Sequence, residues 1–213
     1  MDADPSTGKA KARFCAQDDA FVALVDGAFA DAASRSGPHL LCREGCAQCC
    51  IGVFAIGPAD ALRLKQGLAA LQQEDPARAI RVQQRAAASW SRLVAQFPGN
   101  AACGLLHTDS EGEPAAEFAD FGNDEPCPVL DPEHGCCELY ASRPQTCRLF
   151  GPPVETPEGY GVCELCFHHA TGAEIAEAAI VAPSAEISGA LDLTAMAAGE
   201  PAGPTIVAFV LKS

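Results

Sequence analysis

The sequence predicts a mainly α-helical single domain with small irregular and β-hairpin elements and a cysteine-rich core. Apolar residues recur at helical spacing in several segments, and ten of the twelve cysteines fall in two groups. The length of 213 residues is enough for one core. We expect one domain over 1–213, with a helical segment at 1–39, the cysteine-rich core at 40–170 and a helical or strand appendage at 171–213.

The first helix is expected between residues 16 and 37. Asp18 and Asp19 favour its N-terminal end, where carboxylates interact well with the helix dipole, and Gly37 followed by Pro38 ends it. One apolar stripe should face a core, because apolar residues recur at steps of three and four: Phe21, Leu24, Val25, Ala28, Phe29 and Ala32.

Two more helices are expected after the first cysteine group. Gly57 followed by Pro58 starts one of them, which carries three leucines on one face: Leu64, Leu68 and Leu71. Asp75 before Pro76 is typical of a cap followed by proline at the first helical position, and this helix should run to Pro98. These helices serve as scaffold.

The second half of the chain contains shorter elements. Residues 100–125 are rich in Gly, Pro, Asp and Glu, which predicts an acidic loop, and residues 127–140 favour a small hairpin. Ser142 is expected to cap a short helix that carries Cys147. Residues 173–181 and 187–198 predict two Ala-rich helices, and the final TIVAFVL segment is either a strand or a buried helical turn.

The charge of the chain disfavours nucleic acid and anionic lipid as partners. There are 14 Lys and Arg against 28 Asp and Glu, a formal charge of −14, which repels phosphate. The acidity is local: residues 93–213 hold three cations and eighteen acids.

The location expected from the sequence is the cytoplasm. The longest apolar run near the C-terminus, 206–211, is far below the roughly 18 to 20 residues of a membrane helix. The N-terminus opens with two aspartates and has no apolar signal segment. No membrane association is therefore expected.

The cysteines favour metal binding. In a reducing compartment so many thiols call for a metal or redox explanation. A Cys-x2-Cys step occurs at Cys46 to Cys49 and again at Cys163 to Cys166, which lets one turn bring two thiolates to one ion or iron–sulfur cluster. Cys49 and Cys50 point apart if the chain is extended. In that case they contact different metals, or one of them lies next to the ligands without binding the metal. Both can serve one centre only if a turn brings them together.

For the remaining cysteines and two histidines, the sequence leaves the role in metal binding open or disfavours it. Cys15 and Cys103 have no partner nearby in sequence and are expected to be small buried hydrophobic residues. Either or both of Cys163 and Cys166 should ligate. His168 and His169 are more often exposed loop residues than ligands. Cys136 is undecided, since only one of the pair with Cys137 need face the metal.

Arg143 and Arg148 are the only cations between Leu93 and Leu211, and they bracket Cys147. Guanidinium groups beside a negatively charged thiolate cluster would stabilise it and donate hydrogen bonds to sulfur, so both are candidate cofactor-binding residues. The alternative is that both arginines pair with nearby acids.

The two cysteine blocks resemble a known family. CREGCAQCC and the later CPVLDPEHGCCELYASRPQTCRLFG are similar to the CxxCxxCC cysteine-cluster family, YkgJ-like domains associated with zinc or iron chelation. Three residues separate Cys42 from Cys46, where the family name implies two. The second block matches at Cys127, Pro128, Leu130, Gly135, Cys137, Tyr140, Arg143, Pro144, Cys147, Arg148 and Phe150.

The resemblance implies chelation by cysteine within a metal-binding core at 40–170. The candidate metal ligands are Cys42, Cys46, Cys49, Cys50, Cys127, Cys137, Cys147 and Cys166. These thiolates exceed one tetrahedral shell, which favours two metals or a cluster with spare cysteines beside it. Soft thiolates do not separate zinc from iron or from a 4Fe-4S cluster.

Three functions follow from this reading. The leading one is a cytosolic module that chelates zinc or iron through its two blocks. Flagellin lysine N-methylases carry a similar cysteine arrangement, so the second is an iron-dependent enzyme that modifies protein or peptide side chains. The third is metal storage or delivery. The sequence leaves open whether the chain has a protein partner.

Overall fold

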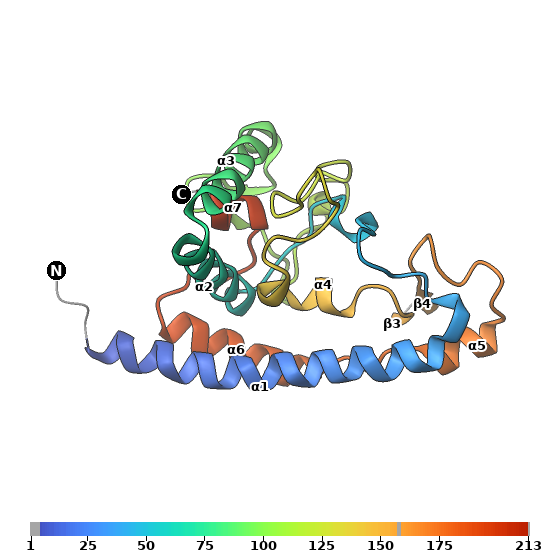
Figure 1. Ribbon diagram of the computed structural model, residues 1–213. Helices are drawn as coiled ribbons and strands as arrows, with labels where there is room; N and C mark the ends of the chain where they lie inside the picture. Colours follow the sequence, from blue (N-terminus) through green and yellow to red (C-terminus); the bar gives the residue numbers. More distant parts are fainter. Residues whose placement is uncertain (1–4, 157–158, 213) are drawn as a thin grey trace.

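The computed structural model describes residues 5–156 and 159–212 (Figure 1). Its helices are α1 Pro5–Ser36, α2 Pro58–Glu74, α3 Pro76–Leu93, α4 Gln145–Leu149, α5 Gly172–Ala178, α6 Ala185–Ala197 and α7 Val207–Leu211. Two antiparallel pairs join β1 Gly99–Asn100 to β2 Leu105–Leu106 and β3 Val154–Thr156 to β4 Gly159–Gly161. The predicted mainly α fold with small β elements is confirmed.

The helices form two groups joined by α2. The long helix α1 runs along one side of the molecule, with α5 and α6 packed on it (Figure 1). Helices α2, α3 and α7 pack together, and α2 also contacts α6. Backbone hydrogen bonds join the first cysteine segment to the second, for example from Cys127 N–H to the Cys50 carbonyl at 2.7 Å. The helices thus frame the loops that carry most of the cysteines.

Helix α1 begins about three turns earlier than the sequence predicts. Its apolar stripe extends back to Phe14, which is fully buried with Phe21 and Val25 against α2 and α6. Asp18 consequently lies in the middle of the helix and not near its start. It is buried and ion-paired with Arg63, so its expected role at the helix N-terminus is wrong.

Of the two alternatives for the C-terminal segment, a strand or a buried helical turn, the structure has the helix. A bridge between Ile56 and Thr205 leads into α7, whose side chains are largely buried. Val207, Val210 and Leu211 join the core formed by α2 and α3. The segment packs on both α2 and α3 and so stabilises the scaffold of the cysteine loops.

The predicted short elements are found with two differences. Helices α5 and α6 occupy the predicted Ala-rich segments, and a bridge between Leu130 and Cys137 forms the small hairpin. Ser142 does not cap α4: it lies in a 3₁₀ turn, Tyr140–Ser142, and Pro144 occupies the cap position. The β3–β4 pair was not predicted, because its strands are mostly exposed and lack an apolar alternation.

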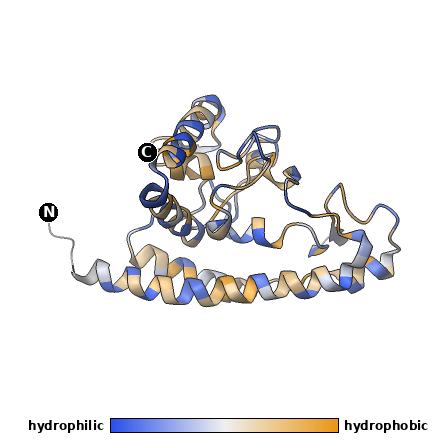
Figure 2. Ribbon diagram, viewed as in Figure 1, coloured by the Kyte–Doolittle hydropathy of each residue, from blue (hydrophilic) through white to orange (hydrophobic). Residues whose placement is uncertain are grey.

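The surface keeps several large apolar side chains exposed. Figure 2 shows apolar residues along α1 and α6, and Leu24 and Leu193 on these helices are exposed. Among the helices in the described part of the chain, none is long and apolar enough to cross a membrane.

Candidate metal centres

The structure divides the candidate ligands into two groups of neighbouring thiols, and the division cuts across the sequence blocks. We call them the Cys42 group, made of Cys42, Cys46, Cys163 and Cys166, and the Cys127 group, made of Cys49, Cys50, Cys127, Cys137 and Cys147. The first sequence block therefore contributes two cysteines to each group.

The Cys42 group lies where the chain after α1 meets the segment before α5. The thiols of Cys42 and Cys166 are hydrogen-bonded to each other, and Leu41 N–H points at the Cys166 sulfur at 3.4 Å. Cys163 and Cys166 are buried, whereas Cys42 is exposed. A Cβ added at Gly151, whose φ is +131°, would lie 2.9 Å from the Cys42 sulfur, so this sulfur packs directly on the backbone.

The Cys127 group lies at the junction of the two sequence blocks. The 3₁₀ turn Gln48–Cys50 places Cys49 and Cys50 in one group. Two adjacent cysteines need such a turn if both are to face one centre. Cys127 and Cys137 pack against the core formed by α2, α3 and α7. Cys147 joins them from α4. Three separate segments of the chain thus converge.

Helix α3 anchors the hairpin that carries Cys127 and Cys137. Arg78 Nε donates to the Glu138 carboxylate at 2.8 Å, and Arg85 pairs with the other carboxylate oxygen. Arg85 Nε also donates to the Pro128 carbonyl at 2.9 Å. Because the Glu138 side chain is only 5% exposed, these charge-assisted bonds fix the hairpin more firmly than surface pairs would.

Backbone N–H groups point at several of the sulfurs. Such bonds stabilise the thiolate form that metals bind. Turns in which the N–H two residues after a cysteine faces its sulfur recur at three positions. The donors are Val129 and Leu130 to Cys127, Leu139 to Cys137 and Leu165 to Cys163. Both groups thus have backbone donors ready for thiolates.

Phe167 continues the Cys163 to Cys166 turn in a left-handed conformation. Its φ is +61°, and among the described residues other than glycine it alone has a positive φ. The conformation costs roughly 1 kcal/mol or more for a side chain other than glycine. Its ring is buried and stacks on His39 at a centroid distance of 5.7 Å, which offsets this cost.

The electrostatics oppose simultaneous ionisation of the thiols in the absence of a cation. Burial raises the pKa of Cys127 to about 12. Cys42 is exposed as a residue, but its sulfur packs on Gly151, and this local desolvation together with the neighbouring sulfurs raises its pKa to about 12. The exception is Cys49, whose pKa is lowered to about 6 by a hydrogen bond with Cys50 and, more weakly, by the guanidinium of Arg143. A bound cation would reverse the cost of gathering thiolates.

The side chains as they stand do not enclose an ion. In residues 5–156 and 159–212, no three His, Cys, Asp or Glu side chains are arranged to hold one. The thiols are instead hydrogen-bonded to one another, as in Cys42 with Cys166 and Cys49 with Cys50. Rotation about a single Cα–Cβ bond redirects each sulfur. The donor set is soft thiolate with N–H support, which fits zinc or iron, and binding requires this rotation.

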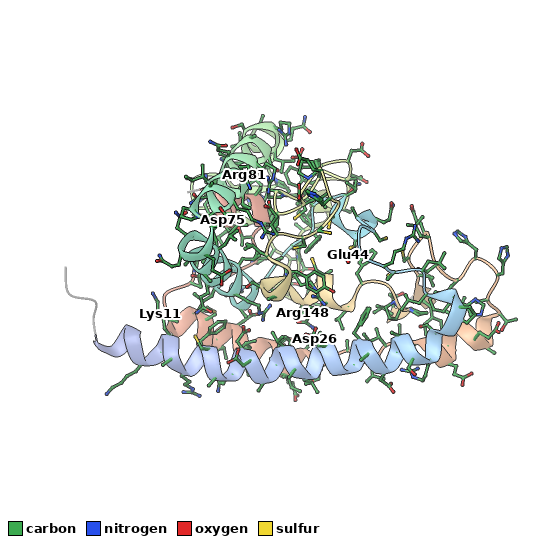
Figure 3. All side chains as sticks on the ribbon, viewed as in Figure 1. Lys11, Asp26, Glu44, Asp75, Arg81 and Arg148 are labelled. Atoms are coloured by element: carbon green, nitrogen blue, oxygen red, sulfur yellow. The ribbon has the colours of Figure 1, made fainter. Side chains whose placement is uncertain are left out.

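Arg143 and Arg148 lie beside the Cys127 group, but their hydrogen bonds within the described part of the chain go to oxygen atoms and not to the sulfurs. Arg148 Nη1 donates to both Asp26 carboxylate oxygens at 2.9 Å, and Figure 3 shows the two side chains facing each other between α4 and α1. Arg143 lies 3.6 Å from the same carboxylate and stacks on Tyr140. The pairing with acids is therefore present, and the guanidinium charges also lower the pKa of Cys137 against the larger effect of its burial.

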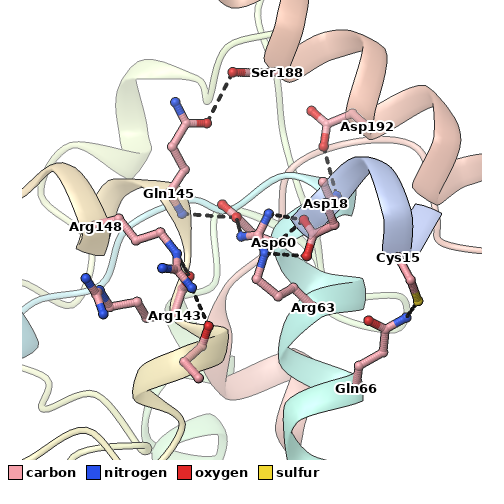
Figure 4. Close-up of polar contacts among 12 residues, drawn as sticks. Cys15, Asp18, Asp60, Arg63, Gln66, Arg143, Gln145, Arg148, Ser188 and Asp192 are labelled. Carbon is pink, nitrogen blue, oxygen red and sulfur yellow. Dashed lines mark hydrogen bonds and ion pairs between the residues drawn. The ribbon is translucent and has the colours of Figure 1, made fainter. Parts of the chain in front are cut away.

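A buried polar network holds α4, and with it Cys147, against three other helices (Figure 4). Gln145 N–H donates to the Asp60 carboxylate at 3.0 Å, and Ser188 donates to the Gln145 side chain at 3.2 Å. Asp60 is in turn paired with Arg63, which also binds Asp18 of α1. No sequence pattern indicates this network, because its members lie on four different helices.

The remaining cysteines and histidines lie outside both groups. Cys15 and Cys103 are exposed, so their prediction as buried hydrophobic residues is wrong. Cys15 follows the buried Phe14 and faces outward, and Cys103 lies at the tip of the β1–β2 turn. The Cys136 sulfur donates to the His134 carbonyl at 3.5 Å. His168 and His169 are exposed.

Gly135 allows the hairpin to approach the first cysteine segment, and its replacement by alanine should separate them. Its φ is +68°, and an added Cβ would lie 2.9 Å from the Gly45 carbonyl oxygen. Gly135→Ala should cost about 1 kcal/mol in backbone strain and roughly 1 to 3 kcal/mol more from the clash. Chemical denaturation of the metal-loaded protein measures the loss.

Gly112→Ala is the matched control for Gly135→Ala. Gly112 also has a positive φ, +87°, but nothing lies within 4 Å of the added Cβ. It should therefore show the strain cost alone. Equal losses in the two variants would mean that the approach of the two segments contributes nothing to stability.

Comparisons with known proteins agree with this site. The model of the CxxCxxCC family, described as "Putative zinc- or iron-chelating domain", matches residues 41–166. Searches of curated proteins and of solved structures found no match. The matched range covers more than half of the chain and contains every residue of both thiol groups. The chain therefore belongs to the CxxCxxCC family.

Proposed function

We propose that this chain binds zinc or iron at two separate cysteine centres, one at each thiol group. The observation that carries this proposal is the division of nine cysteines into two sets, each gathered from segments far apart in sequence. Thiols from 42–50, 127–147 and 163–166 converge although they lie far apart in sequence, and a bound cation would offset the cost of ionising them together.

Each group has enough sulfur for one centre. The Cys42 group supplies four thiolates, the number that a closed zinc site takes. The Cys127 group supplies five, so one of its members lies beside the ligands. Cys49 and Cys50 are the candidates for this place, because their thiols are hydrogen-bonded to each other and so share a proton. Either group also suits an iron–sulfur cluster, which four cysteines hold.

We also propose the surroundings of these centres. Residues 40–170 form the metal-binding core, since they contain both groups. All twelve cysteines are free, which fits a reducing compartment such as the cytoplasm. Arg143 and Arg148 act on the Cys127 centre through their charge, consistent with their opposing the raised pKa of Cys137, for which burial is the largest cause.

Metal analysis tests the proposal. The full chain is purified without oxygen, and its metal, acid-labile sulfide and absorbance spectrum are measured. About two zinc ions per chain in a colourless protein indicate two zinc centres. Iron with sulfide and broad visible absorbance indicates iron–sulfur clusters. A folded protein without either metal above background would overturn the proposal.

Metal delivery is a second candidate function, favoured by the exposure of Cys42. A centre with one exposed ligand can be attacked by an incoming chelator, whereas Cys147 and the rest of the Cys127 group are at least partly covered. Delivery requires such an accessible ligand.

Removal of metal by a chelator should accordingly occur in two phases. We expect the Cys42 centre to lose its metal about tenfold or more faster than the Cys127 centre, because exposed sites open at lower free-energy cost. Stopped-flow release into a coloured chelator gives the two rates, and Cys42→Ser should abolish the fast phase only. A single phase in the wild-type protein would argue against separate centres of different accessibility.

A further inference from the structure

A cavity of about 200 Å³ lies between α2, the β1–β2 turn and the segment that leads into α7. None of the residues around it belongs to either thiol group. Pro58 and Ala61 of α2 and Phe209 and Val210 of α7 supply apolar walls, and Cys103 lies at its edge. The cavity is thus separate from the metal centres and is bordered by a thiol of its own.

One wall of the cavity depends on the backbone conformation at Gly104. Gly104 has a φ of +71°, and a Cβ at this position would overlap the ring of Phe209. The Thr205 hydroxyl donates to the Gly104 carbonyl at 2.7 Å and holds the turn against the segment before α7. The absence of a side chain at Gly104 therefore lets the aromatic ring form the wall.

The cavity is positively charged within an acidic protein. Lys65 and Lys212 line it together with one acid, Glu200, whereas the whole chain carries −14. Glu200 is largely buried and bound to Lys65 at 2.7 Å, so one cation is already neutralised. The Lys212 ammonium lies 4.3 Å from the ring centroids of Trp90 and Phe209. None of the ion pairs found among the described residues involves Lys212.

We propose that this cavity binds a small organic anion, namely a carboxylate with a short apolar body. The ammonium of Lys212 binds the carboxylate, and the apolar walls cover the body. The volume is below the roughly 300 to 1,000 Å³ of sites for drug-sized ligands, which limits the ligand to a short alkyl chain or a single ring.

Octanoate protection of Cys103 from alkylation tests the proposal on the full metal-loaded chain. Cys103 and Cys15 are both exposed and lie outside the thiol groups, but only Cys103 lines the cavity. The protein is treated with N-ethylmaleimide, and modification is followed by peptide mass spectrometry. At about ten times its Kd, octanoate should slow modification of Cys103 about tenfold, because only the unbound fraction reacts. Cys15 should react at an unchanged rate.

Two controls separate anion recognition from nonspecific effects. Octan-1-ol has the same alkyl body without the charge and should protect Cys103 much less. Lys212→Gln should abolish protection by octanoate, whereas Lys9→Gln, at an exposed position of α1, should retain it. Unchanged reactivity of Cys103 with octanoate, equal slowing of Cys15, or equal protection in Lys212→Gln would each overturn the proposal.

Discussion

Replacing Cys127 by serine should remove the metal of the Cys127 group and leave the other centre loaded. Bound zinc should fall from about two equivalents to about one, because a serine hydroxyl is a hard, protonated ligand that does not substitute for a thiolate. Cys166→Ser should also halve the metal content, but from the other centre. Elemental analysis of both variants measures the loss.

The two variants together distinguish separate centres from one joint cluster. If the groups are independent, the double variant Cys127→Ser/Cys166→Ser should lose almost all metal, and the two losses should add. Cys103→Ser is the matched control, since it removes a thiol outside both groups and should retain full metal content. Loss of all metal in either single variant would show one shared centre instead of two.

Patterns of short range in the sequence were enough to predict where α2 and α3 begin. Proline and its preceding residue mark the starts of α2 and α3 at Pro58 and Pro76, as predicted. Asp75 does cap α3, accepting from Arg78 N–H at 2.9 Å. These signals are reliable because a helix terminus is decided by neighbouring residues, through proline geometry and capping bonds.

The grouping of the thiols could not be predicted from spacing. Cys46 and Cys49 form a Cys-x2-Cys step, which suggested one shared ion, yet they lie in different groups. The reason is tertiary: Cys46 meets thiols from residues 163–166, and Cys49 meets the hairpin and α4. The packing of whole helices decides which segments meet, and the spacing of cysteines in the local sequence does not predict this packing.

Asp18 shows the same limit for charge. Its position in a presumed first turn suggested favourable interaction with the helix dipole, whereas the helix extends back to Pro5 and buries Asp18 against Arg63, 45 residues away. The apolar Phe14, seven residues or about two helical turns before Phe21, was the signal that could have extended the helix. A buried ion pair between distant helices has no sequence pattern, because either partner alone looks like a surface charge.

Replacing Arg63 by methionine should cause the largest loss of stability of any single change considered. Arg63 is 4% exposed, and its Nε donates to the two Asp18 oxygens at 3.0 and 2.9 Å while the guanidinium also binds Asp60. Without it, two buried carboxylates lack a counter-charge, which costs roughly 3 to 5 kcal/mol. That is a large share of the roughly 5 to 15 kcal/mol that stabilises a typical domain.

The comparison variant is Arg92→Met, which removes an exposed pair. Arg92 binds Glu125 at 2.6 Å, but its side chain is 55% exposed, so its loss should cost about 1 kcal/mol or less. Denaturant unfolding of both variants in the metal-loaded state gives the difference. If Arg63→Met does not fold, Arg63→Met/Asp18→Asn should recover soluble protein, because it removes one of the unpaired charges.

The pH dependence of Arg63→Met identifies the cause of its instability. Burial raises the pKa of Asp60, and Arg63 opposes this shift, so the variant should raise it further. A carboxyl with a raised pKa in the folded state binds its proton more tightly when folded, so stability falls as the pH rises through that range. The groups facing Asp60 from the other helices are Asp18 on α1, Gln145 on α4 and Asp192 on α6.

The stability deficit of Arg63→Met relative to the wild-type protein should therefore shrink as the pH is lowered from neutrality toward the raised pKa of the folded-state Asp60. Comparison of the two proteins at each pH cancels any loss of metal common to both. The N–H of Gln145 binds Asp60, so an unpaired Asp60 also loosens the start of α4 and the position of Cys147. A deficit that stays constant with pH would assign the instability to lost packing of the Arg63 side chain instead of to the buried carboxylates.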